Sequence, residues 1–406
     1  MHVLFVEPAF PSNQRQFVRA LRLSGARVTA IGESAPQALD SELRGWLHGY
    51  ERVRSVVDEE ALLQAVRRCQ AREWVDRLEA TVEAHVLPAA RVRAACRIPG
   101  TTLETAHLCR DKPSMKQALR EAGVACAASA GVSSPGEALA FVERVGFPVI
   151  LKPRDSAGAS NTYRVTDLDG LRDALAASGV GSGGSVAIEE FVEGHEGFYD
   201  TVCAGGRVVH EFFSHYYPNV LQAMRERWIS PQFVTTNRVD APGYDEVRQM
   251  GARVIRRLGI GTSATHMEWF FGPRGLKFSE IGCRPPGVDA WEVYCAANEM
   301  DLYLEWARAV LDLPPRERPS RRFAAGHVAL RPERDGRIEG YSGVDEVVRA
   351  YGDWIVSIHL PPAGTPTQPI EAGFKANAWI RLRHPDYDEL RRMLDRVGQV
   401  LRVRAG

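Results

Sequence analysis

Two glutamates, Glu268 and Glu280, lie on either side of a short Gly-Pro-Arg-Gly segment at residues 272–275. The apolar segments that flank it predict two antiparallel strands joined by this turn, which would bring both carboxylates close on one face. Two neighbouring carboxylates repel each other, and a shared divalent cation removes that repulsion. Since hard oxygen ligands suit Mg²⁺ held between protein and phosphates, the hairpin is a candidate metal site. The alternative is a pair of solvated surface residues.

A second feature is Lys152, which ends the apolar run that begins at Pro148. An ammonium group at the end of a buried strand is costly unless an anion neutralises it, and a phosphate would do so. Lys112 adds a cation on the first turn of a predicted helix. The small residues at 155–160 have backbone N–H groups that could cradle phosphate oxygens. The chain has only five lysines, and most other basic residues are arginines. Each lysine could therefore be needed as a compact point charge, and the alternative is an ordinary solvated side chain. The five are Lys112, Lys116, Lys152, Lys277 and Lys375.

Five segments between residues 109 and 287 resemble, in order and spacing, the ATP-grasp superfamily, and most of all its ligases that join amino acids to amines. They are Asp111-Lys112, Val149–Pro153, Ile188–Glu196, His266–Glu268 and Glu280–Gly287. The resemblance implies an enzyme that binds ATP with Mg²⁺, or with Mn²⁺ as the alternative. It makes Lys112 and Lys152 ligands of the ATP phosphates, with the loop through Gly158 folding over them. Four residues of the third segment would bind the base and the ribose: the Glu189 side chain, the backbone of Glu190 and Val192, and the Glu196 side chain.

The resemblance also assigns the reaction centre. Glu268 and Glu280 would hold the metal, while Arg284, together with Lys152, would be catalytic by steadying the transferred phosphate and the oxyanion. His266 lies two residues before Glu268, so on a strand both side chains point the same way. We expect His266 and Arg284 to contact substrate, with a packed structural histidine as the alternative reading of His266.

One position departs from the pattern. Many members have a Glu-x-Asn-x-Arg sequence at the metal, and this chain has Gly282 in place of the asparagine. A side-chain oxygen for a second metal ion is therefore missing, which leaves the number of metal ions open.

The segment pattern predicts an α/β and α+β protein with the ATP-grasp fold. Residues 2–32 read as a strand, a helix and a strand, typical of a doubly wound parallel sheet, but G-x-G-x-x-G is absent. We expect an N-terminal domain at 1–105, an ATP-grasp domain at 106–313 with a lid subdomain at about 124–195, and a C-terminal α+β domain at 314–406.

The amino-acid composition limits the classes of binding partner that we expect. Lys+Arg and Asp+Glu both number 51, so the positive field typical of nucleic-acid binding is absent. No run of about 18 apolar residues predicts a membrane span. The seven cysteines include no C-x-x-C pair, so neither zinc nor disulfides are indicated. We expect a cytoplasmic enzyme with small-molecule partners, no nucleic-acid or membrane partner, and a homodimer as one assembly that the resemblance allows.

The expected reaction activates a carboxylate as an acyl phosphate and couples it to an amine, with release of ADP and phosphate. A carboxylase that activates bicarbonate, similar to biotin carboxylase, is the first alternative. That family continues past its arginine with Gln-Val-Glu, whereas this chain has Pro286-Gly287-Val288. The second alternative is a nucleotide-binding regulator without catalysis. The sequence does not identify the acid or the amine.

Overall fold

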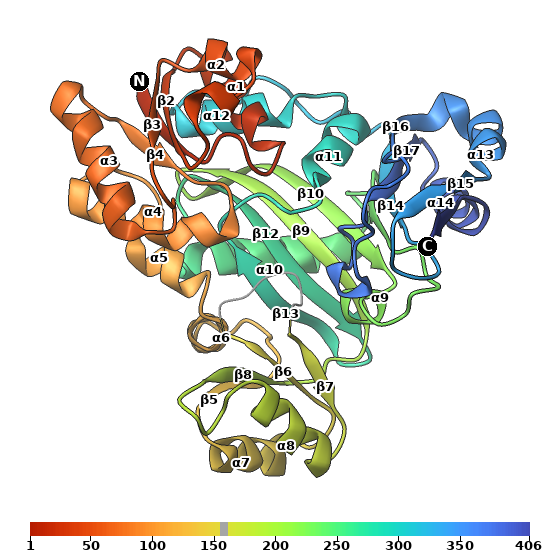
Figure 1. The fold of residues 1–406 in the computed structure, drawn as a ribbon. Helices are drawn as coiled ribbons and strands as arrows, with labels where there is room; N and C mark the ends of the chain where they lie inside the picture. The colour runs from red at the N-terminus through yellow and green to blue at the C-terminus, as the bar shows by residue number, and fades with distance from the viewer. Residues whose placement is uncertain (155–160) are drawn as a thin grey trace.

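The computed structural model describes residues 1–154 and 161–406. Three lobes surround a large central sheet (Figure 1). The N-terminal lobe is built on a parallel sheet in the order β3-β2-β1-β4, which confirms the predicted strand, helix, strand opening. Its strands are β1 (His2–Val6), β2 (Arg27–Gly32), β3 (Gly49–Arg52) and β4 (Arg77–Glu79). Its helices are α1 (Gln14–Leu23), α2 (Ser41–Trp46), α3 (Glu59–Arg72) and α4 (Glu83–Cys96), followed by α5 (Leu103–Leu108).

The second lobe is a small antiparallel sheet in the order β5-β8-β6-β7, with two helices packed on one face through a shared apolar core. The chain enters it from α6 (Lys112–Glu121). Its elements are β5 (Ser129–Val132), α7 (Pro135–Val145), β6 (Val149–Pro153), β7 (Tyr163–Val165), α8 (Leu168–Ala177) and β8 (Val186–Glu190). A capping box at Ser134 and Glu137 begins α7, so the turn chemistry of the sequence defines this helix.

The central sheet has eight strands in the order β13-β12-β9-β10-β11-β14-β17-β16. Its first five are β9 (His195–Ala204), β10 (Arg207–Tyr217), β11 (Gln232–Thr235), β12 (Ser263–Gly272) and β13 (Gly275–Gly282). Side chains alternate across these strands, and one face packs against α6 and α10 (Gly243–Arg257). The opposite face packs partly against α11 (Ala290–Asn298) and α12 (Leu302–Val310), and the rest of it stays open. The short helix α9 (Val220–Ala223) lies at the rim.

The C-terminal lobe extends this sheet through β14 (Ala324–Leu330), β16 (Ile355–His359) and β17 (Ala378–His384). The separate pair β15 (Ile338–Ser342) and β18 (Arg402–Ala405) lies with α13 (Val344–Tyr351) and α14 (Tyr387–Val400). The α+β character agrees with the sequence, but three strands complete the central sheet rather than forming a sheet of their own. The boundaries at residues 105 and 313 stay predictions. Across the described ranges, no helix is both long and apolar enough to cross a membrane.

Aromatic packing joins the N-terminal lobe to the central sheet. Phe17 of α1 stands 4.9 Å from Trp306 of α12, edge to face, and 5.1 Å from Trp291 of α11. The ring centroid of Tyr303 also lies 4.9 Å from that of Phe17. The packing of these rings holds the N-terminal lobe in place, so that the ends of its strands lie over the open face of the central sheet.

We expect Trp306→Ala to lower the free energy of unfolding by about 3–5 kcal/mol, because it leaves a large cavity at this joint. Trp306 is 2% exposed, whereas Trp228 is 78% exposed and makes a matched control. Denaturant unfolding of both variants measures the difference. Equal stability of Trp306→Ala and Trp228→Ala would contradict the proposed joint.

Candidate functional site

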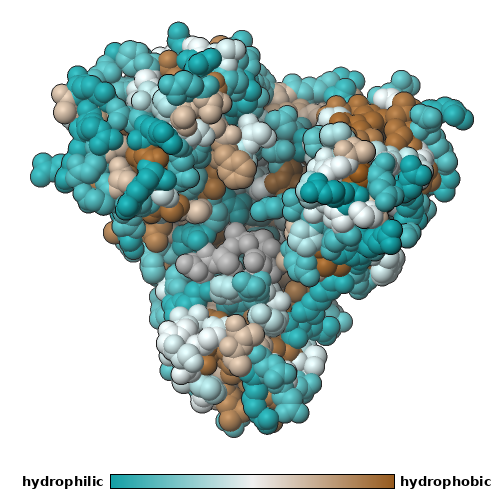
Figure 2. All heavy atoms as spheres, viewed as in Figure 1, coloured by the Kyte–Doolittle hydropathy of each residue, from teal (hydrophilic) through white to brown (hydrophobic). Residues whose placement is uncertain are grey.

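A cleft of about 1540 Å³ lies between the three lobes, with the open face of the central sheet as its floor. Figure 2 shows the hollow on the face turned to the viewer. Its volume exceeds that of an ordinary small-ligand pocket, about 300–1,000 Å³, so a nucleotide and a second ligand fit together. All the described candidate residues line it: Lys112, Lys152, Glu189, Glu190, Val192, Glu196, His266, Glu268, Glu280 and Arg284. Gly158 lies outside the described residues.

Buried lysines form the centre of the cleft. The Nζ of Lys152 lies 2.9 Å from Oε2 of Glu189 and 3.6 Å from Oε2 of Glu280. Lys112 Nζ approaches the same Glu280 oxygen at 3.5 Å, and Lys116 Nζ lies 2.7 Å from Glu189. Burial alone would lower the pKa of Lys152, but Glu189 and Glu280 raise it above its usual value. The ammonium of Lys152 therefore stays charged between Glu189, the candidate contact for the base, and Glu280, the candidate metal ligand.

The sequence reasoning missed Lys116. It lies one helical turn after Lys112 on α6, and residues four apart share one helix face. Together with the scarcity of lysine, this spacing was a usable signal.

Asp111 fixes the position of Lys112. Its carboxylate accepts from the Ser114 backbone N–H at 3.1 Å, which caps α6, and from Arg154 Nε at 2.8 Å. Arg154 directly follows β6, the strand that carries Lys152. The two lysines are thus held together by one ion pair between the helix start and the strand end.

The two carboxylate oxygens of Glu189 differ in their contacts. Its Oε2 binds Lys116 and Lys152, while its Oε1 is buried and has no hydrogen-bond partner among the described residues. A buried acceptor left unpaired is costly, and an N–H donor from a ligand would satisfy it. This orphaned oxygen fits the predicted adenine contact. Its second role, as the anchor of two lysines, was not predicted.

Glu190 follows Glu189 at the end of β8, and its side chain is already engaged. The carboxylate accepts from the Ala128 backbone N–H at 3.0 Å and from Lys277 Nζ at 3.1 Å. The backbone N–H of Glu190 also donates to the Ala128 carbonyl, at 2.9 Å, so a contact of Glu190 with a base would fall to its backbone carbonyl. A backbone contact with the base is the role predicted for Glu190 and Val192. That role stays a prediction.

Glu196 is predicted to bind the ribose. Its Oε2 accepts from the Val220 backbone N–H at 2.7 Å. Burial, together with the nearby Glu268 carboxylate, raises the pKa of Glu196 to about 8. The group is therefore largely protonated at neutral pH, so it can donate to a hydroxyl oxygen as well as accept from one.

The register of the β12–β13 hairpin places Glu268 directly opposite Glu280. Opposite side chains on such a pair stand about 4.5–5.5 Å apart at Cβ, close enough to share one ion. Burial alone would raise the pKa of Glu280, but Lys112 and Lys152 lower it to about 2. In the described part of the chain no cluster of three or more His, Cys, Asp or Glu could hold a metal. Two carboxylates that leave further positions to water and phosphate oxygens suit Mg²⁺.

Arg284 is held by a residue that the sequence did not indicate. Its Nε donates to Glu83 of α4, and its Nη1 donates to the Pro285 carbonyl at 2.8 Å. Glu83 also accepts from Arg110 at 2.6 Å. Burial opposes ionisation, but the two arginines hold the pKa of Glu83 at about 2. Glu83 and Arg284 are 201 residues apart, and no local pattern links them.

The same contact accounts for Gly282. A Cβ at this position would lie 3.1 Å from the Glu83 carboxylate and 3.4 Å from Arg284 Nε. A side chain at this position would therefore require the Glu83–Arg284 ion pair to shift by a few tenths of an ångström.

His266 connects two carboxylates. Its Nδ1 lies 2.7 Å from Oδ1 of Asp200, and its Nε2 lies 3.5 Å from Oε1 of Glu268. Burial alone would lower the pKa of His266, but Asp200 raises it to about 9, so the ring is protonated at neutral pH. The structure thus gives His266 a role in holding Glu268, while its predicted substrate contact stays a prediction.

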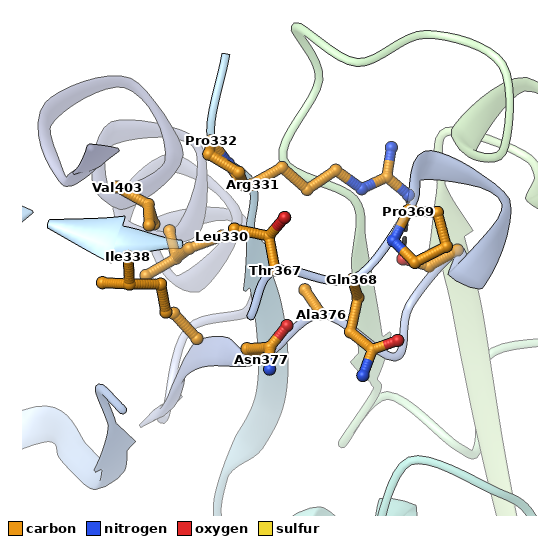
Figure 3. Close-up of a pocket in the computed structure, with 12 residues that line it drawn as sticks. Leu330, Arg331, Pro332, Ile338, Thr367, Gln368, Pro369, Ala376, Asn377 and Val403 are labelled. Atoms are coloured by element: carbon orange, nitrogen blue, oxygen red, sulfur yellow. Dashed lines mark hydrogen bonds between the residues drawn. The ribbon is translucent and has the colours of Figure 1, made fainter. Parts of the chain in front are cut away.

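A second cavity lies in the C-terminal lobe beside β14 and β15 (Figure 3). Leu330, Thr367 and Asn377 are among its lining residues. Its volume of about 10 Å³ is no more than a single water needs. This cavity is a packing void and no site for a substrate.

Several known proteins are similar to this chain in sequence or in fold. Residues 111–203 match the family model for the carbamoyl-phosphate synthase L chain, ATP binding domain. An L-arginine-specific L-amino acid ligase of Bacillus subtilis is 28% identical over 218 residues, which are 52% of this chain and 52% of that protein. The chain thus spans about half the length of this curated relative.

Two solved structures share the fold over the full length. The L-amino acid ligase from Bacillus licheniformis has a TM-score of 0.78 and 17% identity, with 100% of this chain and 98% of that chain covered. An N5-carboxyaminoimidazole ribonucleotide synthetase from Thermotoga maritima has a TM-score of 0.71 and 16% identity, covering 100% and 99%. The family-model match covers the lysine and Glu189 segments, and the likeness to these solved structures shows that the whole chain has the ATP-grasp fold.

Proposed function

We propose that this protein is an ATP-dependent ligase that activates a carboxylate as an acyl phosphate and couples it to an amine, releasing ADP and phosphate. The observation that carries the proposal is the position of Lys152. Its ammonium lies between Glu189, which has an orphaned acceptor suited to a base, and Glu280, which faces Glu268 across the hairpin. Contacts for the base, the phosphates and the metal would thus follow one another from the small antiparallel sheet to the central sheet.

ATP with Mg²⁺, or with Mn²⁺ as the alternative, would supply the phosphoryl group and the driving force, held by Glu268, Glu280 and the lysines. Lys112 and Lys152 place positive charge where phosphate oxygens would lie. Because they are buried and already oriented by carboxylates, little reorganisation is needed when the anion arrives. Catalysis by such a site rests on positioning and charge neutralisation, and no side-chain nucleophile is required.

Arg284 would stabilise the transferred phosphoryl group and the oxyanion of the tetrahedral intermediate. Glu83 holds Nε, and the Pro285 carbonyl holds Nη1, so the guanidinium has a fixed orientation in the cleft. Its Nη2 has no hydrogen bond to any of the described residues and remains free for a ligand oxygen. The two N–H groups of Nη2 can both donate to ligand oxygens, and the guanidinium stays charged at neutral pH.

Ligation is favoured over bicarbonate activation by the residues that follow Arg284. Pro286, Gly287 and Val288 line the cleft but carry no acid or base. A carboxylase needs a base to deprotonate bicarbonate, whereas a ligase needs an acyl phosphate held in line with a neutral amine.

We expect ADP release to require a carboxylic acid and an amine together, with one ADP and one phosphate formed per amide. A coupled ADP-release screen over pairs of amino acids and small carboxylates, with mass spectrometry of products, measures this. Added bicarbonate should have no effect. ADP release that depends on bicarbonate and biotin, and on no acid and amine pair, would refute the ligase.

We expect Lys152→Met to lower kcat/KM by about 100- to 1,000-fold, because a preorganised charge on the transferring phosphate is lost. Circular dichroism should show an unchanged fold, and ATP binding should weaken in calorimetry. Near-normal turnover by the variant would show that Lys152 does not contact the phosphates.

Glu268→Gln and Glu280→Gln should each shift the Mg²⁺ concentration for half-maximal activity upward by at least about 10-fold, since a neutral amide is a poorer ligand for a hard cation. Glu211 of β10 is the matched control, because it pairs with Arg248 and Tyr199 and does not line the cleft. If Glu211→Gln shifts the Mg²⁺ dependence as much as the other two do, the metal assignment is wrong.

A further inference from the structure

Three polar residues on the N-terminal wall of the cleft are not among the candidate contacts for ATP or for the metal. Glu7 follows β1, Glu33 follows β2, and His85 lies on the first turn of α4 beyond β4. All three line the cleft. They stand at the carboxyl ends of parallel strands, the edge at which open α/β sheets bind ligands.

The two carboxylates have no counter-charge of their own. Oε2 of Glu7 accepts from the Glu33 backbone N–H at 2.9 Å, and Oε1 of Glu33 accepts from the Val56 backbone N–H at 2.9 Å. Among the described residues, no Lys, Arg or His forms an ion pair with Glu7 or Glu33. Burial raises the pKa of Glu7, and the Glu33 carboxylate adds to the rise. A cation bound beside the two carboxylates would therefore favour their ionised forms, which burial and mutual repulsion oppose.

His85 gives an independent sign of a missing ligand. Its side chain is buried, with only 8% of the residue exposed, yet Nδ1 has no hydrogen-bond partner in the described part of the chain. Burial lowers the pKa of His85, so the ring is neutral at neutral pH and does not offset the carboxylates. A buried ring nitrogen without a partner is costly, and a ligand that exchanges a proton with it would relieve that cost.

This wall adjoins the reaction centre. Glu83, two residues before His85, holds the Arg284 guanidinium. Glu33, Glu83, His85 and Arg284 all line the cleft, so a ligand bound by Glu33 and His85 would share it with the group proposed to stabilise the oxyanion. On the same wall Phe10 lines the cleft with 74% of its surface exposed, an unusual exposure for a phenyl ring unless it meets an apolar group.

We propose that Glu7, Glu33 and His85 form the subsite that binds the amine substrate through its ammonium group, with Phe10 against an apolar substituent. The inference rests on the proposed ligase function. An ammonium has three donors and one charge, which match two carboxylates and an imidazole nitrogen. Before the amine attacks the acyl phosphate, the ammonium would pass one proton to the unpartnered nitrogen of the neutral His85 ring, which leaves the neutral amine as the nucleophile. The same carboxylates repel anions, so the acid substrate and the phosphates are kept to the lysine and Arg284 side of the cleft.

Equilibrium binding tests the subsite without turnover. The probes are the common L-amino acids, each compared with its N-acetyl derivative, added to the protein with Mg²⁺ and a non-hydrolysable ATP analogue. We expect the wild type to prefer at least one free amino acid, of apolar side chain, over its acetylated form. Glu33→Gln and Glu7→Gln should each weaken that binding by about 10- to 100-fold while ATP-analogue binding stays unchanged.

Glu51→Gln is the matched control. Glu51 belongs to the same lobe and pairs with Arg68 and Arg72, away from the cleft. This control should bind the amino acid as the wild type does. No preference for the free ammonium in the wild type, or wild-type binding by both Glu33→Gln and Glu7→Gln, would overturn the subsite.

A kinetic experiment distinguishes failure of the proposed subsite from failure of the proposed ligase function. Hydroxylamine, a small nucleophile that is neutral at neutral pH, should trap the acyl phosphate as a hydroxamate in the wild type and in Glu33→Gln at similar rates. The KM for the amine should rise at least about 10-fold in Glu33→Gln, with the KM for ATP unchanged. No hydroxamate with any acid in the wild type would refute the ligase reaction, whereas an unchanged amine KM would refute only the subsite.

Discussion

The ion-pair cluster of Lys152, Glu189 and Glu280 is the constraint on which the rest of the site depends. Charges this deeply buried are tolerated only when each is paired, and here one ammonium is shared between two carboxylates that come from different sheets. Glu189 comes from the small antiparallel sheet, and Glu280 comes from the central sheet. The cluster therefore ties the small antiparallel lobe to the cleft floor while leaving one Glu189 oxygen for a ligand.

The floor of the cleft follows from strand alternation. On β12, Met267 and Trp269 pack into the core against α10, so His266 and Glu268 must face the cleft. The pairing with β9 brings Asp200 opposite His266, and the hairpin brings Glu280 opposite Glu268. A slip of one residue in either register would turn the carboxylates into the core. The apolar residues on the core-facing side of the sheet thus fix the orientation of the polar residues on its cleft-facing side.

Local patterns predicted much of this arrangement. The Gly-Pro-Arg-Gly turn predicted the β12–β13 hairpin, and the apolar run before Lys152 predicted β6, because turn chemistry and periodicity are properties of a few adjacent residues. The ion pair between Glu83 and Arg284 was beyond reach, since its partners are 201 residues apart.

Other features were missed for the same physical reason. The addition of β14, β17 and β16 to the central sheet depends on long-range pairing that no short segment records. The convergence of Glu7, Glu33 and His85 depends on three separate strand ends of one parallel sheet. The tight space at Gly282 likewise depends on a side chain from another lobe.

Anomalous X-ray scattering from Mn²⁺, in crystals grown with a non-hydrolysable ATP analogue, tests the central claim most directly. The account predicts an anomalous peak between the Glu268 and Glu280 carboxylates, with the phosphates against Lys112 and Lys152 and the adenine amino group facing Glu189 Oε1. A metal peak away from both glutamates, or a nucleotide bound without contact to either lysine, would contradict it.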